Sequence, residues 1–290
     1  VIYIFTQFKN SFNKRFMDKG KTYIVVLWDG SEQAENAYRH AQFMRKKIEY
    51  PVLLVRIVKE KGLFESKASY DMEVEREREL LKSAAEELGR KYGIVPDCIV
   101  KQGAFKSCMK EVLNEYSCSI IISPETYSIP KGEEVAIARE YSKYGDTDVA
   151  VLVTNKAPQT KHSSIEIVIP MEHEAEFKDV IDCVIAFSRK YECNFNFVKP
   201  VLSDAQPKRE LLSNIYFTKQ VLEANNIVYG IKSATGSDNF VDEIFSFAGS
   251  IEADYILTTS INYGLIRKNP KYGEVPIIWI NPHKRLLQNF

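Results

Sequence analysis

The sequence has no excess of charge of either sign. Its 290 residues include 39 Lys and Arg against 39 Asp and Glu, which gives a formal net charge of zero. A chain without net positive charge has no overall electrostatic attraction to nucleic acid or to an anionic membrane. We therefore predict that neither is a partner, with a local basic patch as the alternative that the total charge leaves open.

Long apolar runs are also missing. The longest, such as residues 23–28, are far shorter than the ~20 apolar residues of a membrane-spanning helix. The N-terminal residues lack the basic start, the apolar stretch and the small-residue cleavage site of a signal peptide. We expect residues 1–20 to form an extension ahead of the fold and residues 284–290 to form a C-terminal tail. Whether residues 1–16 belong to the native product is left open.

Cysteine and histidine are few, and their spacing does not match the common metal motifs. There are five cysteines, an odd number, and no CxxC. A disulfide framework or a zinc ribbon is therefore not indicated, and a reducing cytoplasm is the favoured location. The four histidines show neither HExxH nor H-x3-H spacing. At His173, which lies between two glutamates, we expect an acidic first helical turn rather than a metal site.

The motifs of several large enzyme classes are absent. The sequence contains no GxGxxG dinucleotide fingerprint, no GxxxxGK[ST] phosphate loop and no GxSxG nucleophile elbow. No pattern of residue types and spacing therefore identifies a catalytic residue. We predict that the chain is not an enzyme, with a nucleotide-dependent enzyme as the alternative.

What the sequence does contain is an alternation of strand and helix patterns. In the first half, the continuous apolar run at residues 22–28 is typical of a parallel strand buried on both faces, and a second run at 52–58 is also expected to be a strand. Ser31 is a suitable N-cap for the helix after the first run, and Gly93 is a suitable end for the long charged helix within residues 64–92. The other expected elements are a strand at 98–100, a helix at 104–117, a strand at 119–122, a helix at 133–143 and a strand at 148–153.

The second half repeats this alternation. The polar segment 155–164, which contains Pro158, separates the halves and is typical of a linker. We predict an α/β fold with two similar domains, at residues 21–154 and 164–283, each a five-stranded parallel sheet flanked by helices. The expected second-half strands are 165–169, 194–198, 228–231, 255–257 and 276–280, and the expected helices are 172–191, 207–226 and 238–249.

Parallel sheets of this kind bind ligands at the carboxyl ends of their strands, where the strand order reverses. With five strands in each domain, that point lies between the first and the fourth strand. In the first domain it places residues 29–31 opposite residues 123–126. In the second domain it places residues 170–172 opposite residues 258–260.

Three segments of the first half belong to one recognisable pattern: the strand YIVVLW followed by Asp29-Gly30-Ser31, the long charged helix, and the segment GAFKSCMKEVLNEYSCSIIIS. Together they resemble a universal stress protein (UspA-like) domain, in which Gly103 would take the place of a glycine after the family's third strand. The segment SDNFVDEIFSFAGSIEADYILTTS resembles the same helix–strand stretch in the second half. The resemblance covers about residues 21–283 as two copies. It implies the adenine nucleotide alpha-hydrolase-like fold, and it matches Asp29 to the family's adenine-contacting aspartate.

The sequence departs from the family pattern where nucleotide-binding members carry Gly-x2-Gly-x9-Gly-Ser/Thr. In that pattern, glycines let backbone N–H groups approach phosphates. Here residues 123–134 contain one glycine, two prolines and three carboxylates. Glu133 and Glu134 are expected to occupy the positive end of the next helix and to repel phosphate. The second half has Met171 and Glu172 in place of the aspartate, and its fourth helix is expected to be short or lost.

These departures predict a degenerate nucleotide site without a bound cofactor in a non-enzymatic stress-response or regulatory module. The alternative is a stress protein that binds ATP or AMP, or a nucleotide-dependent enzyme. The last strands of the two domains, at residues 149–153 and 277–280, are expected to pair within the chain as a pseudo-dimer, and a homodimer is left open. The candidate binding residues are Asp29, Gly30, Ser31, Val58, Ser123 and Thr126 in the first domain and Thr259, Ser260, Arg267 and Lys268 in the second.

Overall fold

A computed structural model describes residues 21–63, 65–143, 149–159 and 164–281. The predicted extension at 1–20, the predicted tail at 284–290 and part of the predicted linker lie outside these residues. The contacts within the chain divide it into two units. The first unit runs to Ile122 and adds Tyr127–Val135, and the second comprises Ser123–Thr126 and the chain from Ala136 onward.

The division differs from the domains predicted from the sequence at two places, because Ser123–Thr126 and the chain from Ala136 to residue 154 both go to the second unit. The predicted boundary lies in the linker after residue 154, whereas the contacts place the chain from Ala136 with the second unit. The strand at 150–153 therefore belongs to the second unit by its contacts, although its position in the alternation assigns it to the first domain. The domain boundaries themselves stay a prediction.

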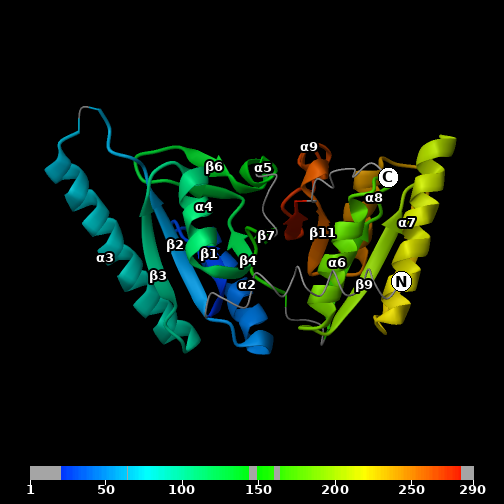
Figure 1. Cartoon of the computed structure of the whole chain (residues 1–290), viewed down its shortest axis with the longest axis horizontal. Coiled ribbons are helices and arrows are strands. Elements are labelled where there is room, and N and C mark those ends of the chain that lie inside the picture. The colour runs from blue at the N-terminus through cyan, green and yellow to red at the C-terminus, as the bar shows by residue number, and fades with distance from the viewer. Residues whose placement is uncertain (1–20, 64, 144–148, 160–163, 282–290) are drawn as a thin grey trace, which may run out of the picture. The chain divides into compact units, whose positions relative to one another are not determined.

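The first unit is built on parallel strands in the order β4-β1-β2-β3 (Figure 1). Because the chain crosses from β1 outward to β3 and then returns past β1 to β4, β1 is the strand at which the order reverses, as the sequence predicted. The strands are β1 (Thr22–Leu27), β2 (Val52–Val58), β3 (Asp97–Gln102) and β4 (Ser117–Ser123). The helices between them are α2 (Glu32–Ile48), α3 (Lys67–Tyr92) and α4 (Phe105–Glu115).

The helix boundaries of the first unit follow the predicted caps. Ser31 has extended backbone, and its hydroxyl accepts a hydrogen bond from Ala34 N–H, which starts α2 as predicted. At the end of α3, Gly93 adopts φ +91°, a conformation that strains any residue with a Cβ. The sequence therefore sets both the start of α2 and the end of α3.

The helix predicted at 133–143 is wrong in its first part. Residues 126–136 form a hairpin of β5 (Thr126–Ser128) and β6 (Glu134–Ala136), and only α5 (Ile137–Tyr141) is helical. Tyr127 and Val135 are buried between more exposed neighbours, which is the two-residue period of a strand. Glu133 and Glu134 therefore lie in the hairpin and not at a helix N-terminus.

The second unit has strand order β10-β9-β8-β11-β12-β7. Neighbouring strands are parallel except for β7, which pairs antiparallel with β12 through Val153 with Ile277 and Val151 with Trp279. The strands are β7 (Ala150–Val153), β8 (Ile165–Pro170), β9 (Cys193–Lys199), β10 (Tyr229–Ser233), β11 (Tyr255–Thr259) and β12 (Ile277–Ile280). The sequence assigns β7 to the first predicted domain and β12 to the second. Because the contacts place both strands in the second unit, the pairing of two separate domains as a pseudo-dimer stays a prediction.

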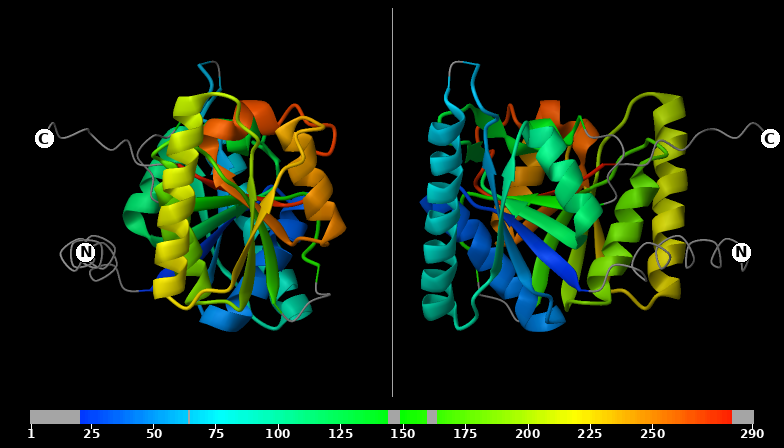
Figure 2. Two further views of the ribbon diagram at one scale, coloured as in Figure 1. Left: turned by 90° about the vertical axis from the view of Figure 1, so that its right-hand side faces the viewer. Right: turned by 60° about the vertical axis from the view of Figure 1, so that its left-hand side comes forward.

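Helices cover both faces of the second unit's sheet. The left view of Figure 2 shows α7 and α8 on opposite sides of the strands. After β11, only the short helices η1 and α9 precede β12, so the fourth helix is shortened as predicted. The helices are α6 (Phe177–Ser188), α7 (Ala205–Ala224), α8 (Phe240–Ser250), η1 (Ser260–Asn262) and α9 (Tyr263–Ile266). The α/β fold with parallel strands flanked by helices is thus confirmed.

Helix α6 begins later than the predicted residue 172. The carbonyl oxygens of Glu172 and Glu174 both accept hydrogen bonds from the side-chain amide of Asn214 in α7, each at 2.9 Å. The carbonyl oxygen of Glu174 also accepts from Phe177 N–H at 3.3 Å, in a tight turn that leads into the helix, and α6 itself begins at Phe177.

Candidate functional site

The candidate site of the first unit is centred on Asp29, directly after β1. One carboxylate oxygen of Asp29 accepts hydrogen bonds from the backbone N–H and the hydroxyl of Ser31, at 3.0 and 2.5 Å. The other oxygen accepts one from the backbone N–H of Ser128 in β5, at 3.0 Å. Both oxygens are therefore engaged by the protein itself.

Tyr127 fills the space beside this carboxylate. Its ring is fully buried, and its hydroxyl accepts a hydrogen bond from the backbone N–H of Ile57 at 2.8 Å. Pairing of β1 with β2 ends at Leu27 and Val55, so the N–H of Ile57 lies beyond the last pair on that side. Burial raises the pKa of the Tyr127 phenol to about 12. The hydroxyl therefore serves as a neutral acceptor for a backbone group that the shorter strand leaves without a partner.

Arg56 joins four parts of the first unit. Its Nε donates to Glu77 of α3 at 2.9 Å, and both side chains are nearly buried, with 12% and 13% exposed. Its Nη1 donates to the carbonyl oxygens of Trp28 and Ser128, at 3.4 and 3.1 Å. A planar guanidinium can make these bonds in several directions at once. Arg56 thus holds the hairpin segment and the end of β1 against α3.

Removal of the Arg56 guanidinium is expected to destabilise the first unit. In Arg56→Met, Glu77 keeps its nearly buried charge without a partner, which is expected to lower the free energy of unfolding by about 2–4 kcal/mol. Arg78 forms an exposed pair with Glu75 in the same helix. Arg78→Met is therefore expected to cost less than about 0.5 kcal/mol. Urea unfolding of both variants measures the difference, and equal costs would contradict the bridging role of Arg56.

The other predicted residues of the first unit take different places. Gly30 adopts φ +83° in the turn before α2, next to Asp29 and Ser31. Val58 is buried, and its carbonyl accepts from Gly103 N–H at 2.9 Å. The structure brings residues 29–31 together with Ser128, which the sequence did not predict.

The remaining predicted positions of the first domain, Ser123 and Thr126, belong by their contacts to the second unit. Ser123 is fully buried, and its hydroxyl has no hydrogen-bond partner within the described residues. Thr126 is exposed at the start of β5. Ser128, rather than either of these residues, makes the hydrogen bond to Asp29.

The candidate site of the second unit is centred on Glu172, just after β8. Its carboxylate accepts from the Thr259 hydroxyl, with 3.2 and 3.1 Å to the two oxygens, and from the Asn262 amide at 2.7 Å. Glu172 is 8% exposed, and burial raises its pKa to about 7. The expected placement of residues 170–172 opposite residues 258–260 is therefore confirmed. The end of β11 and the η1 turn after it thus bind this carboxylate.

The predicted basic residues of the second unit lie beyond this carboxylate. Ser260 is buried in η1, and Arg267 and Lys268 are exposed after α9. Lys271 donates to the Ser246 hydroxyl at 3.1 Å. None of the hydrogen bonds to the Glu172 side chain within residues 164–281 comes from these basic residues. The predicted second-domain set thus divides into Thr259, bound to Glu172, and a separate basic surface.

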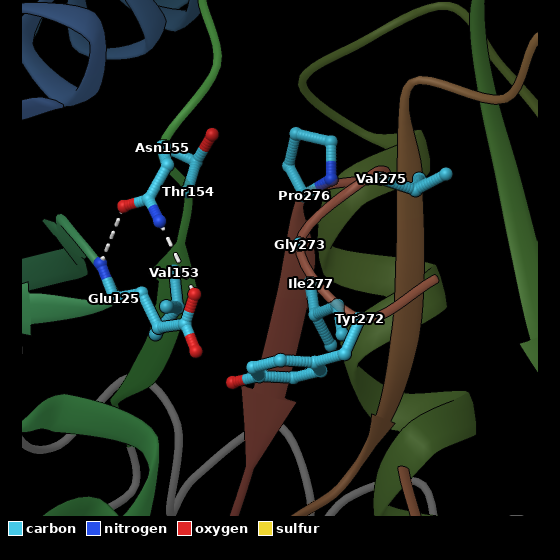
Figure 3. A pocket seen from close by; sticks show the side chains of 9 residues that line it. All are labelled: Glu125, Val153, Thr154, Asn155, Tyr272, Gly273, Val275, Pro276 and Ile277. Atoms are coloured by element: carbon cyan, nitrogen blue, oxygen red, sulfur yellow. Dashed lines mark hydrogen bonds between the residues drawn. The ribbon is translucent and has the colours of Figure 1, made fainter. Parts of the chain in front are cut away.

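A small cavity in the second unit lies between β7 and the segment before β12 (Figure 3). Glu125 and Asn155 line it and exchange two hydrogen bonds: Glu125 N–H donates to Asn155 at 3.0 Å, and the Asn155 amide donates to Glu125 at 3.1 Å. Its volume of about 10 Å³ is close to the minimum for one water molecule. This cavity is therefore too small for a nucleotide.

A larger groove lies in the first unit, between α2 and α3. Its volume is about 440 Å³, within the range of small-molecule sites. It begins at residues 28–31 after β1 and is lined by Arg56 of β2 and by residues of both helices. It therefore adjoins Asp29, whose own hydrogen bonds are already made.

Neither a metal-binding cluster nor a membrane-spanning helix occurs in the described residues. No group of three or more His, Cys, Asp or Glu side chains in that part of the chain is arranged to hold a metal ion. Among the helices described, none is both long and apolar enough to cross a membrane.

Comparison with solved structures identifies similar folds. A universal stress protein from Archaeoglobus fulgidus DSM 4304 superposes with a TM-score of 0.63 at 13% identity, covering 90% of this chain and 97% of that chain. A protein from Pseudomonas aeruginosa UCBPP-PA14, also named as a universal stress protein, gives a TM-score of 0.52 at 12% identity, covering 91% and 94%. No protein-family model and no curated protein sequence matches the chain. The chain therefore has the fold of universal stress proteins, as the sequence resemblance predicted.

Proposed function

We propose that this chain is a tandem UspA-like protein that acts as a non-enzymatic stress-response or regulatory module and whose nucleotide site is degenerate. The observation that supports this most directly is the bonding of Asp29. The carboxylate that the family resemblance matches to adenine contact accepts three hydrogen bonds from Ser31 and Ser128. A ligand at Asp29 would have to share an oxygen that already accepts a hydrogen bond from the protein.

The residues around Asp29 support the same proposal. Tyr127 is buried next to the ends of β1 and β2, and the hairpin that carries it replaces a glycine-rich phosphate loop. The hairpin has Lys131 and Gly132 at its turn, but Glu133 and Glu134 follow them. Carboxylates beside a phosphate would repel it.

The second unit supports a degenerate site for a parallel reason. Thr259 and Asn262 bind the Glu172 carboxylate, so the hydroxyl predicted to contact a ligand already has a partner.

The five cysteines all lie in the described part of the chain as free thiols, which agrees with a reducing cytoplasm. Burial raises the pKa of Cys118 to about 12, which favours an inert thiol over a nucleophile.

The proposal is tested by what the purified protein carries and binds. We expect that mass spectrometry of small molecules released by denaturation will show no adenine nucleotide in near-stoichiometric amount. We also expect calorimetric titration with ATP and with AMP to give no saturable binding. Either nucleotide, retained or bound at one site per domain, would contradict the degenerate site and favour the ATP- or AMP-binding alternative.

Asp29→Ala distinguishes a structural carboxylate from a ligand-binding one. Because Asp29 accepts hydrogen bonds only from the protein in this proposal, its loss is expected to lower the free energy of unfolding by about 1–3 kcal/mol. Asp97, which accepts one exposed hydrogen bond from Tyr23, supplies the control variant Asp97→Ala with a smaller expected loss. Unchanged stability together with lost nucleotide binding in Asp29→Ala would contradict the proposal.

A further inference from the structure

The groove between α2 and α3 of the first unit joins an apolar floor to a lining rich in carboxylates. Leu81 and Leu88 are buried at 3% and 4% exposed, whereas Leu80 remains 52% exposed. These leucines therefore offer apolar contact at the base of the groove. Trp28 also lines the groove, and its indole ring can attract an ammonium group.

The charge of the lining is unbalanced. Five carboxylates line the groove, against two cations, Arg56 and Lys91. A phosphate or a carboxylate ligand would meet this excess of negative charge, whereas a cation would be attracted by it. The carboxylates are Asp29, Glu32, Glu35, Glu77 and Glu87.

Three of the five carboxylates are already engaged. Glu77 pairs with Arg56, Glu35 pairs with Lys91 and also accepts from Tyr92, and Asp29 is bound as described above. The sequence places Glu87 four residues before Lys91 on α3, which predicts an ion pair along the helix. Lys91 instead pairs with Glu35 of α2, because that carboxylate faces it across the helix–helix contact.

Glu32 and Glu87 therefore keep their charge available. Both are exposed, one at the first turn of α2 and the other on α3, and neither forms an ion pair with the residues that the structure describes. A ligand that satisfies both needs at least two positive charges with an apolar stretch between them to contact the leucines.

We propose that this groove binds a linear aliphatic polyamine, with ammonium groups at Glu32 and Glu87 and methylene groups against Leu80, Leu81 and Leu88. Ammonium groups would form charge-assisted hydrogen bonds with the two free carboxylates. The inference rests on the charges and the floor of the groove, and it goes beyond the proposed stress-response function. It would stand even if a nucleotide were found to bind elsewhere in the chain.

The test is calorimetric titration of the full chain with spermidine at low ionic strength, where attraction between charges is least screened. We expect one saturable site per chain. Glu32→Gln and Glu87→Gln are each expected to weaken binding about 5-fold, since each removes one charge pair. Glu79→Gln and Glu86→Gln, two exposed positions of α3 outside the groove lining, are the matched controls and are expected to leave binding unchanged.

Three results would overturn the proposal. The first is the absence of saturable spermidine binding. The second is an equal loss of affinity in the control variants, which would show a general attraction to surface charge. The third is displacement of spermidine by an equal concentration of Mg²⁺, which would show that the apolar contact adds nothing.

Trp28 provides an independent signal at the groove. The chain contains two tryptophans, and the other, Trp279, is buried in β12 of the second unit. Spermidine is expected to change the tryptophan fluorescence of the native chain and to leave that of Trp28→Phe unchanged. A change that persists in Trp28→Phe would place the bound amine away from this groove and would contradict the proposal.

Discussion

Replacing Tyr127 with alanine is expected to lower the free energy of unfolding by about 3–5 kcal/mol. The ring is fully buried and packs near Phe105, with 6.0 Å between the ring centroids, so its removal leaves a cavity. The substitution also removes the acceptor of the Ile57 N–H. Both losses fall on the first unit, and urea unfolding of the variant measures their sum.

Two tyrosine-to-phenylalanine variants distinguish the stability lost through the cavity from the stability lost through the missing hydrogen bond. Tyr127→Phe keeps the ring but leaves the buried N–H of Ile57 without an acceptor, which is expected to cost about 1–3 kcal/mol. Tyr70 donates an exposed hydrogen bond to Gln102, so Tyr70→Phe is expected to cost less than about 0.5 kcal/mol. If Tyr127→Phe cost no more than Tyr70→Phe, the hydroxyl would not have the structural role assigned to it.

Raising the pH from about 4.5 to about 7 is expected to destabilise the second unit through Glu172. Burial raises the pKa of this carboxyl to about 7 in the folded chain, from an ordinary value of 4.5. Between these values the folded state keeps a proton that the unfolded state releases. The stabilisation is therefore complete below pH 4.5 and is lost as the pH rises through 7, by about 3 kcal/mol in total.

Glu172→Gln is expected to remove this pH dependence. Glutamine keeps the shape and an acceptor oxygen for Thr259 and Asn262 but carries no charge. The variant is therefore expected to match the native chain near pH 4.5 and to exceed its stability above pH 7, as measured by urea unfolding across that range. Glu192→Gln, at an exposed carboxylate of the same unit that does not act on Glu172, is the control that should keep the native slope. A Glu172→Gln variant with the native slope would contradict the assignment.

Local patterns predicted most of the fold. The run at 52–58 is a strand with the predicted bounds, and Ser31 and Gly93 act as the predicted caps. Such features depend on residues that are close together in the sequence, so a short stretch of sequence is enough to predict them. The position of Glu172 opposite Thr259 was also predictable, because strand order in a parallel α/β sheet follows from right-handed connections.

The residues that close the first site were not predictable in this way. Tyr127 meets Ile57 across 70 positions of sequence, and Arg56 meets Ser128 across 72. Residues 123–136 read as a loop and the start of a helix, since their prolines and glutamates are compatible with both. The alternation around Tyr127 and Val135 was a signal for the hairpin, but strands of three residues are too short for periodicity to decide.

The antiparallel pair of β7 and β12 has a consequence for the order in which the chain is made. Every residue of the first unit precedes residue 136, so all of its strands are made before the pair of β7 and β12. Strand β7 emerges soon after this unit, but its partner β12 follows much later, because Ile277 pairs with Val153 from far along the chain. Until Ile277 has left the ribosome, β7 has an edge with unpaired backbone groups. Closing such a long-range pair is intrinsically slow, so the second unit depends on its C-terminal strand to complete its sheet.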